Sequence, residues 1–184
     1  MIRTTPTPNP DAYLFQVQET LIPSGTYEFF HDQDLTSSPL AREILEIEGL
    51  ELLMIAPRFI TVRKFSEESW DELLPEITST FEQFLHSGQM AVVESEQSRQ
   101  EQASSDVERQ ILEILQEEVR PAIAQDGGDF IYHGFENGIV KLELIGACGT
   151  CPSSTQTLHV GIENHLMNEI PEVKGIEQIF SEPQ

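Results

Sequence analysis

The chain has two cysteines, and both lie in the run Gly146–Ser154, GACGTCPSS, where two residues separate them. An apolar segment precedes this run, and Pro152 directly follows the second cysteine. Proline suits the first turn of a helix because its missing N–H is not needed there, so Cys148 and Cys151 are predicted at a helix N-terminus. The partial positive charge of that end favours thiolate, which binds soft metals and attacks disulfides. The run therefore predicts a metal or redox site.

Composition indicates in which compartment this site works and which classes of partner it does not bind. Two cysteines do not form a disulfide framework, and they suit a reducing compartment. The net charge of −22 argues against binding to nucleic acids or anionic membranes, because both need clustered Lys and Arg. No apolar run is long enough to span a bilayer. Residues 1–10 lack the apolar segment of a signal peptide, so we expect a bacterial cytoplasmic protein, although a processed chain of the mitochondrial matrix would look the same.

Hydrophobic periodicity and turn residues predict two small α+β domains. The first, residues 1–88, has an extended lead-in with three prolines and then the order strand–strand–helix–strand–strand–helix. Its helices begin after Ser38 and near Ser69, and the second ends at Gly88. Its predicted strands are residues 12–17, 26–30, 50–55 and 59–64.

A polar linker and a second domain follow. Residues 89–104 contain few apolar side chains and predict a flexible linker, although an extension of a neighbouring polar helix would also accommodate them. The second domain, residues 105–184, has a helix that Pro121 is expected to kink or end. Asn137-Gly138 then predicts a hairpin, and the cysteine run, a helix to about residue 169 and a last strand at 173–180 complete it.

The two cysteines supply two ligands, whereas structural zinc sites and iron–sulfur clusters normally have four. Two chains related by a two-fold axis would supply the other two. A cluster shared in this way would be held by few residues, which suits a cluster that is passed on. Three alternatives stay open: a zinc ion shared by a dimer, a thioredoxin-like dithiol, and two inert packing residues. No aromatic residue precedes Cys148, and the pair follows a hairpin, so the dithiol is less favoured.

The other polar motifs give no independent case for catalysis. None of the five histidines has ligand spacing to the cysteines or to another histidine. The run Asp126–Asp129, DGGD, has too few oxygens for a calcium loop and predicts a tight turn. No Ser–His–Asp order, P-loop or paired-carboxylate motif is present. We therefore expect a protein that is not an enzyme and has no catalytic residue.

At the level of family, the second domain resembles the NifU-like C-terminal domain of Nfu-type iron–sulfur scaffold proteins. The residues that carry this resemblance are Arg120-Pro121, Asp126–Asp129, Gly146–Ser154, Thr157-Leu158, Gly161–Glu163 and Ile170–Val173. The first domain resembles the N-terminal domain of the same family. Its matching residues are Thr7–Pro10, Gly25-Thr26, Ser38–Ala41, Ile47–Gly49 and Phe59–Val62. The resemblance covers most of the chain except the linker.

This resemblance implies a scaffold or carrier that holds a 4Fe–4S cluster between two subunits and delivers it to apo-proteins. By position, Cys148 and Cys151 are the implied cluster ligands, two from each subunit of a homodimer that forms when the cluster is bound. The implied partners are apo iron–sulfur client proteins and an upstream assembly scaffold. The N-terminal domain is linked in the family with client recognition or cluster transfer, and Tyr13 stands in a lead-in where relatives often have a lysine.

Overall fold

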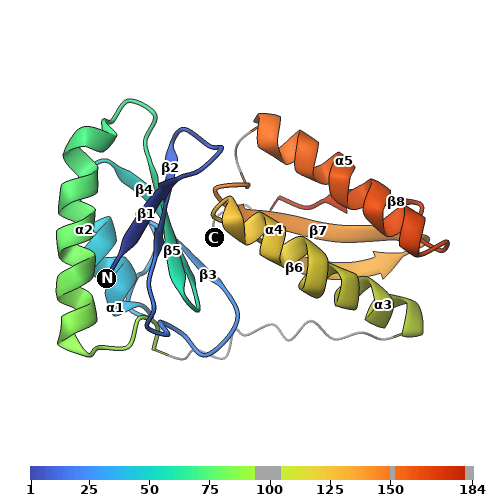
Figure 1. Cartoon of the computed structure of the whole chain (residues 1–184), viewed down its shortest axis with the longest axis horizontal. Helices are drawn as coiled ribbons and strands as arrows, with labels where there is room; N and C mark the ends of the chain where they lie inside the picture. Colours follow the sequence, from blue (N-terminus) through green and yellow to red (C-terminus); the bar gives the residue numbers. More distant parts are fainter. Residues whose placement is uncertain (94–104, 150–151, 181–184) are drawn as a thin grey trace. The chain divides into compact units, whose positions relative to one another are not determined.

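The computed structural model describes residues 1–93, 105–149 and 152–180, and of residues 152–155 it describes the backbone alone. The chain divides into two compact units, Met1–Ser98 and Arg99–Pro183. Each unit contains a sheet and helices, which confirms the predicted class of two small α+β domains (Figure 1). Residues 94–104 of the predicted linker lie outside the described residues. None of the described helices is long and apolar enough to cross a bilayer.

The first unit contains a five-stranded antiparallel sheet in the order β1-β2-β5-β4-β3. Four of its strands were predicted: β2 (Ala12–Gln16), β3 (Tyr27–Phe30), β4 (Leu50–Ala56) and β5 (Phe59–Lys64). The lead-in was expected to be extended, and in the structure it forms β1 (Arg3–Pro6) beside β2. Pro6 is tolerated because β1 lies at the edge of the sheet, where a missing N–H costs little.

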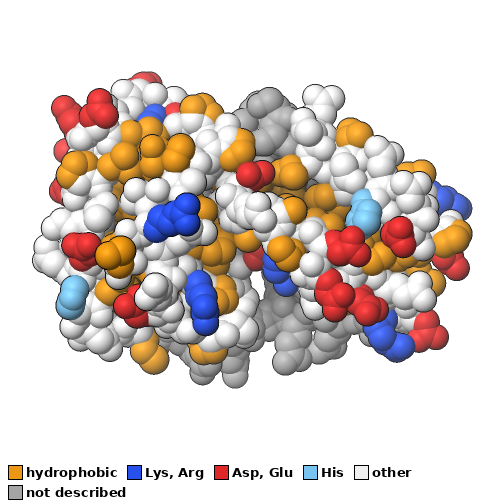
Figure 2. All heavy atoms as spheres, viewed as in Figure 1, with side chains coloured by type: hydrophobic (Ala, Val, Ile, Leu, Met, Phe, Trp, Pro, Cys, Tyr) orange, Lys and Arg blue, Asp and Glu red, His pale blue; other side chains and the backbone are white. Residues whose placement is uncertain are grey.

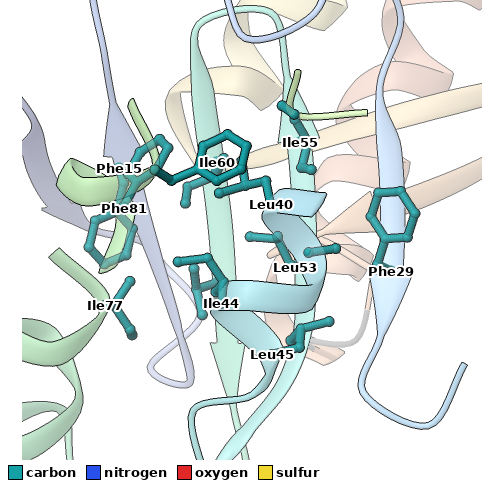
Figure 3. Packing of buried hydrophobic residues seen from close by; sticks show 14 of the residues in the cluster. Phe15, Phe29, Leu40, Ile44, Leu45, Leu53, Ile55, Ile60, Ile77 and Phe81 are labelled. Atoms are coloured by element: carbon teal, nitrogen blue, oxygen red, sulfur yellow. The ribbon is translucent and has the colours of Figure 1, made fainter. Parts of the chain in front are cut away.

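Two helices cover one face of this sheet, α1 (Pro39–Leu45) and α2 (Trp70–Ser87) (Figure 1). Gly88 ends α2 in the left-handed conformation, with φ of 69°, as the sequence predicts. Pro75 lies inside α2, which continues through it. Figure 3 shows side chains from the sheet and both helices meeting in one core, among them Phe15, Leu40, Ile44, Leu53, Ile60, Ile77 and Phe81.

The core of the first unit also includes residues that were assigned to the linker. Ala91 and Val92 are 2% and 8% exposed and belong to the same apolar cluster. The Ser38 Oγ caps α1 by accepting from the Ala41 N–H at 3.0 Å, and it donates to the Ala91 carbonyl at 2.6 Å. The packed part of the unit therefore continues past Gly88. The polar residues that follow obscure this contact in the sequence.

The second unit begins with one long helical segment that consists of α3 (Asp106–Ile114), a π-turn (Leu115–Val119) and α4 (Arg120–Gln125). Pro121 was expected to kink or end the helix. The helix does not end there: the π-turn directly precedes Pro121, with the Arg120 N–H donating to the Leu115 carbonyl, and the helix continues for another turn. Such a wider turn accommodates a residue that cannot donate to the preceding turn.

A three-stranded sheet and a second long helix complete this unit. The hairpin of β6 (Gly128–Glu136) and β7 (Ile139–Gly146) turns at Asn137 and Gly138, whose φ values of 54° and 87° confirm the predicted turn. After α5 (Pro152–Glu169), β8 (Gly175–Gln178) pairs parallel to β7. One apolar cluster joins the helices to this sheet, including Ile111, Leu115, Ile123, Phe130, Leu142, Ile162 and Leu166.

The buried hydroxyl of Ser38 supports a first prediction. We expect Ser38→Ala to lower the free energy of unfolding by about 1–3 kcal/mol, because it leaves the Ala91 carbonyl and the Ala41 N–H buried without this partner. Ser69→Ala is the matched control, since Ser69 caps α2 in an exposed position and its loss should cost about 0.5–1 kcal/mol. Urea denaturation measures both. Equal losses would show that the link from Ser38 to Ala91 adds nothing.

The ion pair between Asp11 and Lys64 supports a second prediction. The Lys64 Nζ lies 2.7 Å from Asp11 Oδ1, and the Lys64 side chain is 6% exposed. The hydrogen bond from Lys64, assisted by one from Ser66, lowers the pKa of Asp11 below its ordinary value of 3.8. A lowered folded-state pKa stabilises the fold above pH 3.8, and this contribution is lost as the pH falls through the folded-state pKa.

We therefore expect Asp11→Asn to lower the free energy of unfolding by about 1–3 kcal/mol at neutral pH, and by progressively less below pH 3.8. Denaturant titrations across that pH range measure the difference. Glu76→Gln, which neutralises an exposed carboxylate on α2, is the control and should shift stability little at any pH. A difference between Asp11→Asn and wild type that stays constant with pH would contradict this explanation.

Candidate functional site

The cysteine run connects the end of β7 to the start of α5, as the sequence predicts. Gly146 is the last residue of β7 and lies opposite Gly128, the first residue of β6. The chain then turns: Gly146 has φ of 70°, the Gly149 N–H donates to the Gly146 carbonyl at 3.3 Å, and the Ala147 N–H donates to the Gly127 carbonyl. Cys151 lies outside the described residues, directly before the first residue of α5.

The side chain of Cys148 is buried in the second unit. It is 1% exposed and belongs to the apolar cluster of that unit. Its Sγ lies against Gly128, because a Cβ atom added to Gly128 would be 2.5 Å from the sulfur and 3.0 Å from Ile123 Cγ2. The absence of a side chain at residue 128 therefore leaves the space that the sulfur occupies. The side chain of Cys148 is therefore shielded from solvent in this position.

The two glycines of the DGGD run have different roles. Gly127 has φ of 75° and makes the turn after α4, whereas Gly128 already belongs to β6. The prediction of a tight turn is right for Asp126 and Gly127 and wrong for the last two residues of the run. A turn of this kind needs only one glycine with positive φ, so the second glycine in the run indicates that Gly128 has another role. Gly149 is also restricted by space, since an added Cβ would be 2.9 Å from the Leu144 carbonyl oxygen.

Arg120 and Asp129 join the start of α4 to the start of β6. Arg120 Nε lies 2.9 Å from Asp129 Oδ1, and the same oxygen accepts the Phe130 N–H at 2.8 Å. The guanidinium carbon of Arg120 lies 4.4 Å from the centre of the Phe130 ring. Asp129 is 7% exposed, so this ion pair is shielded from water on the acidic side. These contacts position the strand end that carries Gly128, a role of Arg120 and Asp129 that the sequence alone does not predict.

Three of the histidines contact groups away from the cysteine turn. His133 pairs with Glu143 at 2.7 Å, His165 pairs with Glu118 at 2.8 Å, and the His159 Nε2 lies 3.1 Å from the Ile176 carbonyl. In the part of the chain that the structure describes, no group of three His, Cys, Asp or Glu side chains is arranged to hold a metal ion. The ligand roles of Cys148 and Cys151 stay predictions.

Comparison with known proteins identifies the family. The family described as "Scaffold protein Nfu/NifU N terminal" matches residues 2–88, and the family described as "NifU-like domain" matches residues 111–177. The human protein named NFU1 iron-sulfur cluster scaffold homolog, mitochondrial, is 41% identical over 98% of this chain and 72% of its own length. The chain belongs to the Nfu/NifU scaffold protein family. The predicted resemblance is thereby confirmed for both units.

A plant relative matches almost the whole of this chain as well. NifU-like protein 4, mitochondrial, of Arabidopsis thaliana is 40% identical over 97% of this chain, which spans 66% of the plant protein. Both names place these relatives in mitochondria, which agrees with the matrix alternative and gives no support to the bacterial cytoplasm. A solution structure of a NifU-like protein from Saccharomyces cerevisiae covers 52% of this chain and 86% of its own, with 28% identity and a TM-score of 0.45.

The close approach of Gly128 to Cys148 supports a third prediction. We expect Gly128→Ala to displace the Cys148 sulfur from its buried position, so that the thiol reacts faster with a maleimide in a Cys151→Ser background. The added methyl group should also lower the free energy of unfolding by about 1–3 kcal/mol. The labelling rate and the urea midpoint measure the two effects.

Gly161→Ala is the matched control, because nothing lies within 4 Å of a Cβ at that helical position. It should raise stability by about 0.5–1 kcal/mol and leave the labelling rate unchanged. If Gly128→Ala labels at the wild-type rate, Gly128 does not position the thiol.

Proposed function

We propose that this Nfu-family chain is an iron–sulfur cluster scaffold and carrier that binds a 4Fe–4S cluster between two copies and transfers it to apo-proteins. The observation that carries the proposal is the position of Cys148 in a glycine-bounded turn directly before the N-terminus of α5, within a matched NifU-like domain. The name of the human relative, a cluster scaffold, supports the same role. The cluster is cargo, and the chain is not an enzyme.

The ligand set follows from the number of thiols. One chain supplies Cys148 and Cys151, and a second copy supplies the same pair, which together give the four thiolates of a 4Fe–4S cluster. The N-terminal end of α5 favours the negative charge of the bound thiolates. Cys148 must leave the space beside Gly128 to reach a shared cluster, and the turn between Gly146 and Gly149 is the element on which it would move.

Transfer is then an exchange of thiolate ligands. A client cysteine loses its proton and binds an iron atom as thiolate, while Cys148 or Cys151 leaves that iron and takes up a proton. Four such exchanges, one for each ligand, keep every iron four-coordinate and change no oxidation state. The apolar space beside Gly128 accommodates the side chain of Cys148 once it is released. Burial of the released thiol therefore opposes rebinding and assists delivery.

The wider setting belongs to the same proposal. Apo iron–sulfur proteins receive the cluster, and an upstream assembly scaffold supplies it. The first unit contacts clients while the segment after Val93 links it to the second domain, which raises the effective concentration of the client near the cluster. The names of the relatives favour the mitochondrial matrix as the place of this activity.

Anaerobic reconstitution with iron and sulfide is the test, and it gives a fourth prediction. We expect about four irons and four sulfides per two chains, with a dimeric mass, and transfer of the cluster to an apo client. Cys148→Ser and Cys151→Ser should each lose the cluster, because each removes two of the four ligands of the dimer. His165→Gln, on the same helix but paired with Glu118, is the control and should retain it.

Two outcomes would replace the proposal by one of its alternatives. A colourless dimer that binds zinc through the same cysteines and takes up no iron would indicate a shared structural zinc site. Rapid and reversible disulfide formation without bound iron would indicate a dithiol oxidoreductase.

A further inference from the structure

The outward side of α5 carries no charged side chain between residues 156 and 168. The exposed positions in this span include Gln156, Thr157, Val160, Asn164, Met167 and Asn168. The charged and titratable residues of the same span point elsewhere: Glu163 accepts the Ile176 N–H at 3.1 Å, and His159 and His165 contact β8 and Glu118. The exposed side of α5 is therefore neutral, and its titratable side chains contact other parts of the second unit.

This neutrality is local, because the rest of the chain is strongly acidic. The net charge is −22, and the exposed sides of the other long helices carry acidic residues. On α2 these are Asp71, Glu72, Glu76 and Glu82, and on α3 and the π-turn they are Asp106, Glu113, Glu117 and Glu118. Figure 2 shows the contrast in the second unit, where acidic side chains lie over α3 and the π-turn while most of α5 shows neutral and hydrophobic ones.

Four of the neutral positions form a heptad stripe. Thr157, Val160, Asn164 and Met167 follow each other at spacings of three, four and three residues, which is the a/d pattern of a coiled coil. They span about 80° of the helix circumference. Val160 and Met167 are 50% and 41% exposed, large fractions for apolar side chains. Asn164 occupies an a position, where a single asparagine fixes the register of paired helices at a cost in stability.

We propose that this stripe is the surface on which two copies of the chain meet, with their α5 helices parallel. The inference rests on the proposed function, because a shared cluster requires both cysteine turns at one place. Parallel pairing about a two-fold axis puts the two α5 N-termini at the same end, about 8–10 Å apart between helix axes. Cys148 and Cys151 of both chains then surround one position on the axis, and Asn164 faces the same residue of the second copy.

Charge explains why the second copy is the occupant and why the cluster controls the pairing. Two copies of an acidic chain repel each other least through a face that carries no charge. A stripe of four residues gives a small interface, and the two parallel helix N-termini also repel each other. A thiolate-bound cluster is negatively charged and lies between those two positive ends, so it removes the repulsion. The apo chain is accordingly monomeric, and the loaded chain is a dimer.

The test adds charge to the stripe. We expect Val160→Glu/Met167→Glu to lower the fraction of reconstituted protein that elutes as an iron-containing dimer by about tenfold or more, because two pairs of like charges face each other. The matched control, Gln83→Glu/Gln110→Glu, adds the same charge at exposed positions of α2 and α3 and should keep the wild-type fraction. Mixing the Glu variant with Val160→Lys/Met167→Lys should restore the dimer, because the stripe faces its own copy.

A gain-of-association variant makes the test independent of any folding defect. Asn164→Val replaces the polar a residue by an apolar one, and it should shift the apo protein from monomer toward dimer in analytical ultracentrifugation. The proposal is overturned if the Glu variant keeps the iron-containing dimer, if the control loses it equally, or if Asn164→Val leaves the apo protein monomeric. Wild-type protein that takes up no iron would instead overturn the proposed function.

Discussion

The contact between the Cys148 sulfur and the backbone of Gly128 is the constraint on which the rest of the second unit depends. β6 and β7 pair so that Gly128 lies opposite Gly146, and the turn after Gly146 brings Cys148 back against the first residue of β6. A side chain at residue 128 would fill this space. The ion pair of Arg120 and Asp129 joins the same strand end to α4. Helix, hairpin and cysteine turn are therefore positioned together.

In the proposed carrier, Cys148 has two alternative environments: a buried position in the apo chain and an exposed position on the cluster. Against Gly128 the side chain lies in the apolar cluster, and Cys148 is 1% exposed. On a cluster it is a thiolate at a helix N-terminus, where negative charge is stabilised. A permanent electron-transfer site gains nothing from a well-packed apo state, since that state competes with the cluster. A carrier does gain from it, because the competition makes release possible. In this interpretation the apolar packing of Cys148 is part of the transfer mechanism.

The sequence predicts the features that one residue type determines locally, and it misses those that arise from tertiary contact. Gly88 and Asn137-Gly138 mark a helix end and a hairpin because few other residues adopt a positive φ, and Ser38 marks a helix start because its side-chain oxygen accepts a backbone N–H of the first turn. By contrast, the contact between Ala91 and Ser38 joins residues that lie far apart in the chain, so no local pattern predicts it. Gly128 resembles an ordinary turn glycine until the neighbouring sulfur is known. The cysteine pair predicts a metal or redox site because two thiols at this spacing have few purely structural roles.

Because the chain is strongly acidic, a neutral surface is the one through which two copies repel each other least. A chain of net charge −22 resists self-association, so a dimer that forms only with its cargo needs a face without charge and an added attraction at one end. The outer side of α5 supplies the first, and a negative cluster between two helix N-termini would supply the second. Acidic surfaces elsewhere then act against dimers that lack a cluster. The cargo-dependent assembly that we propose thus follows from the same distribution of charge that opposes self-association of the apo chain.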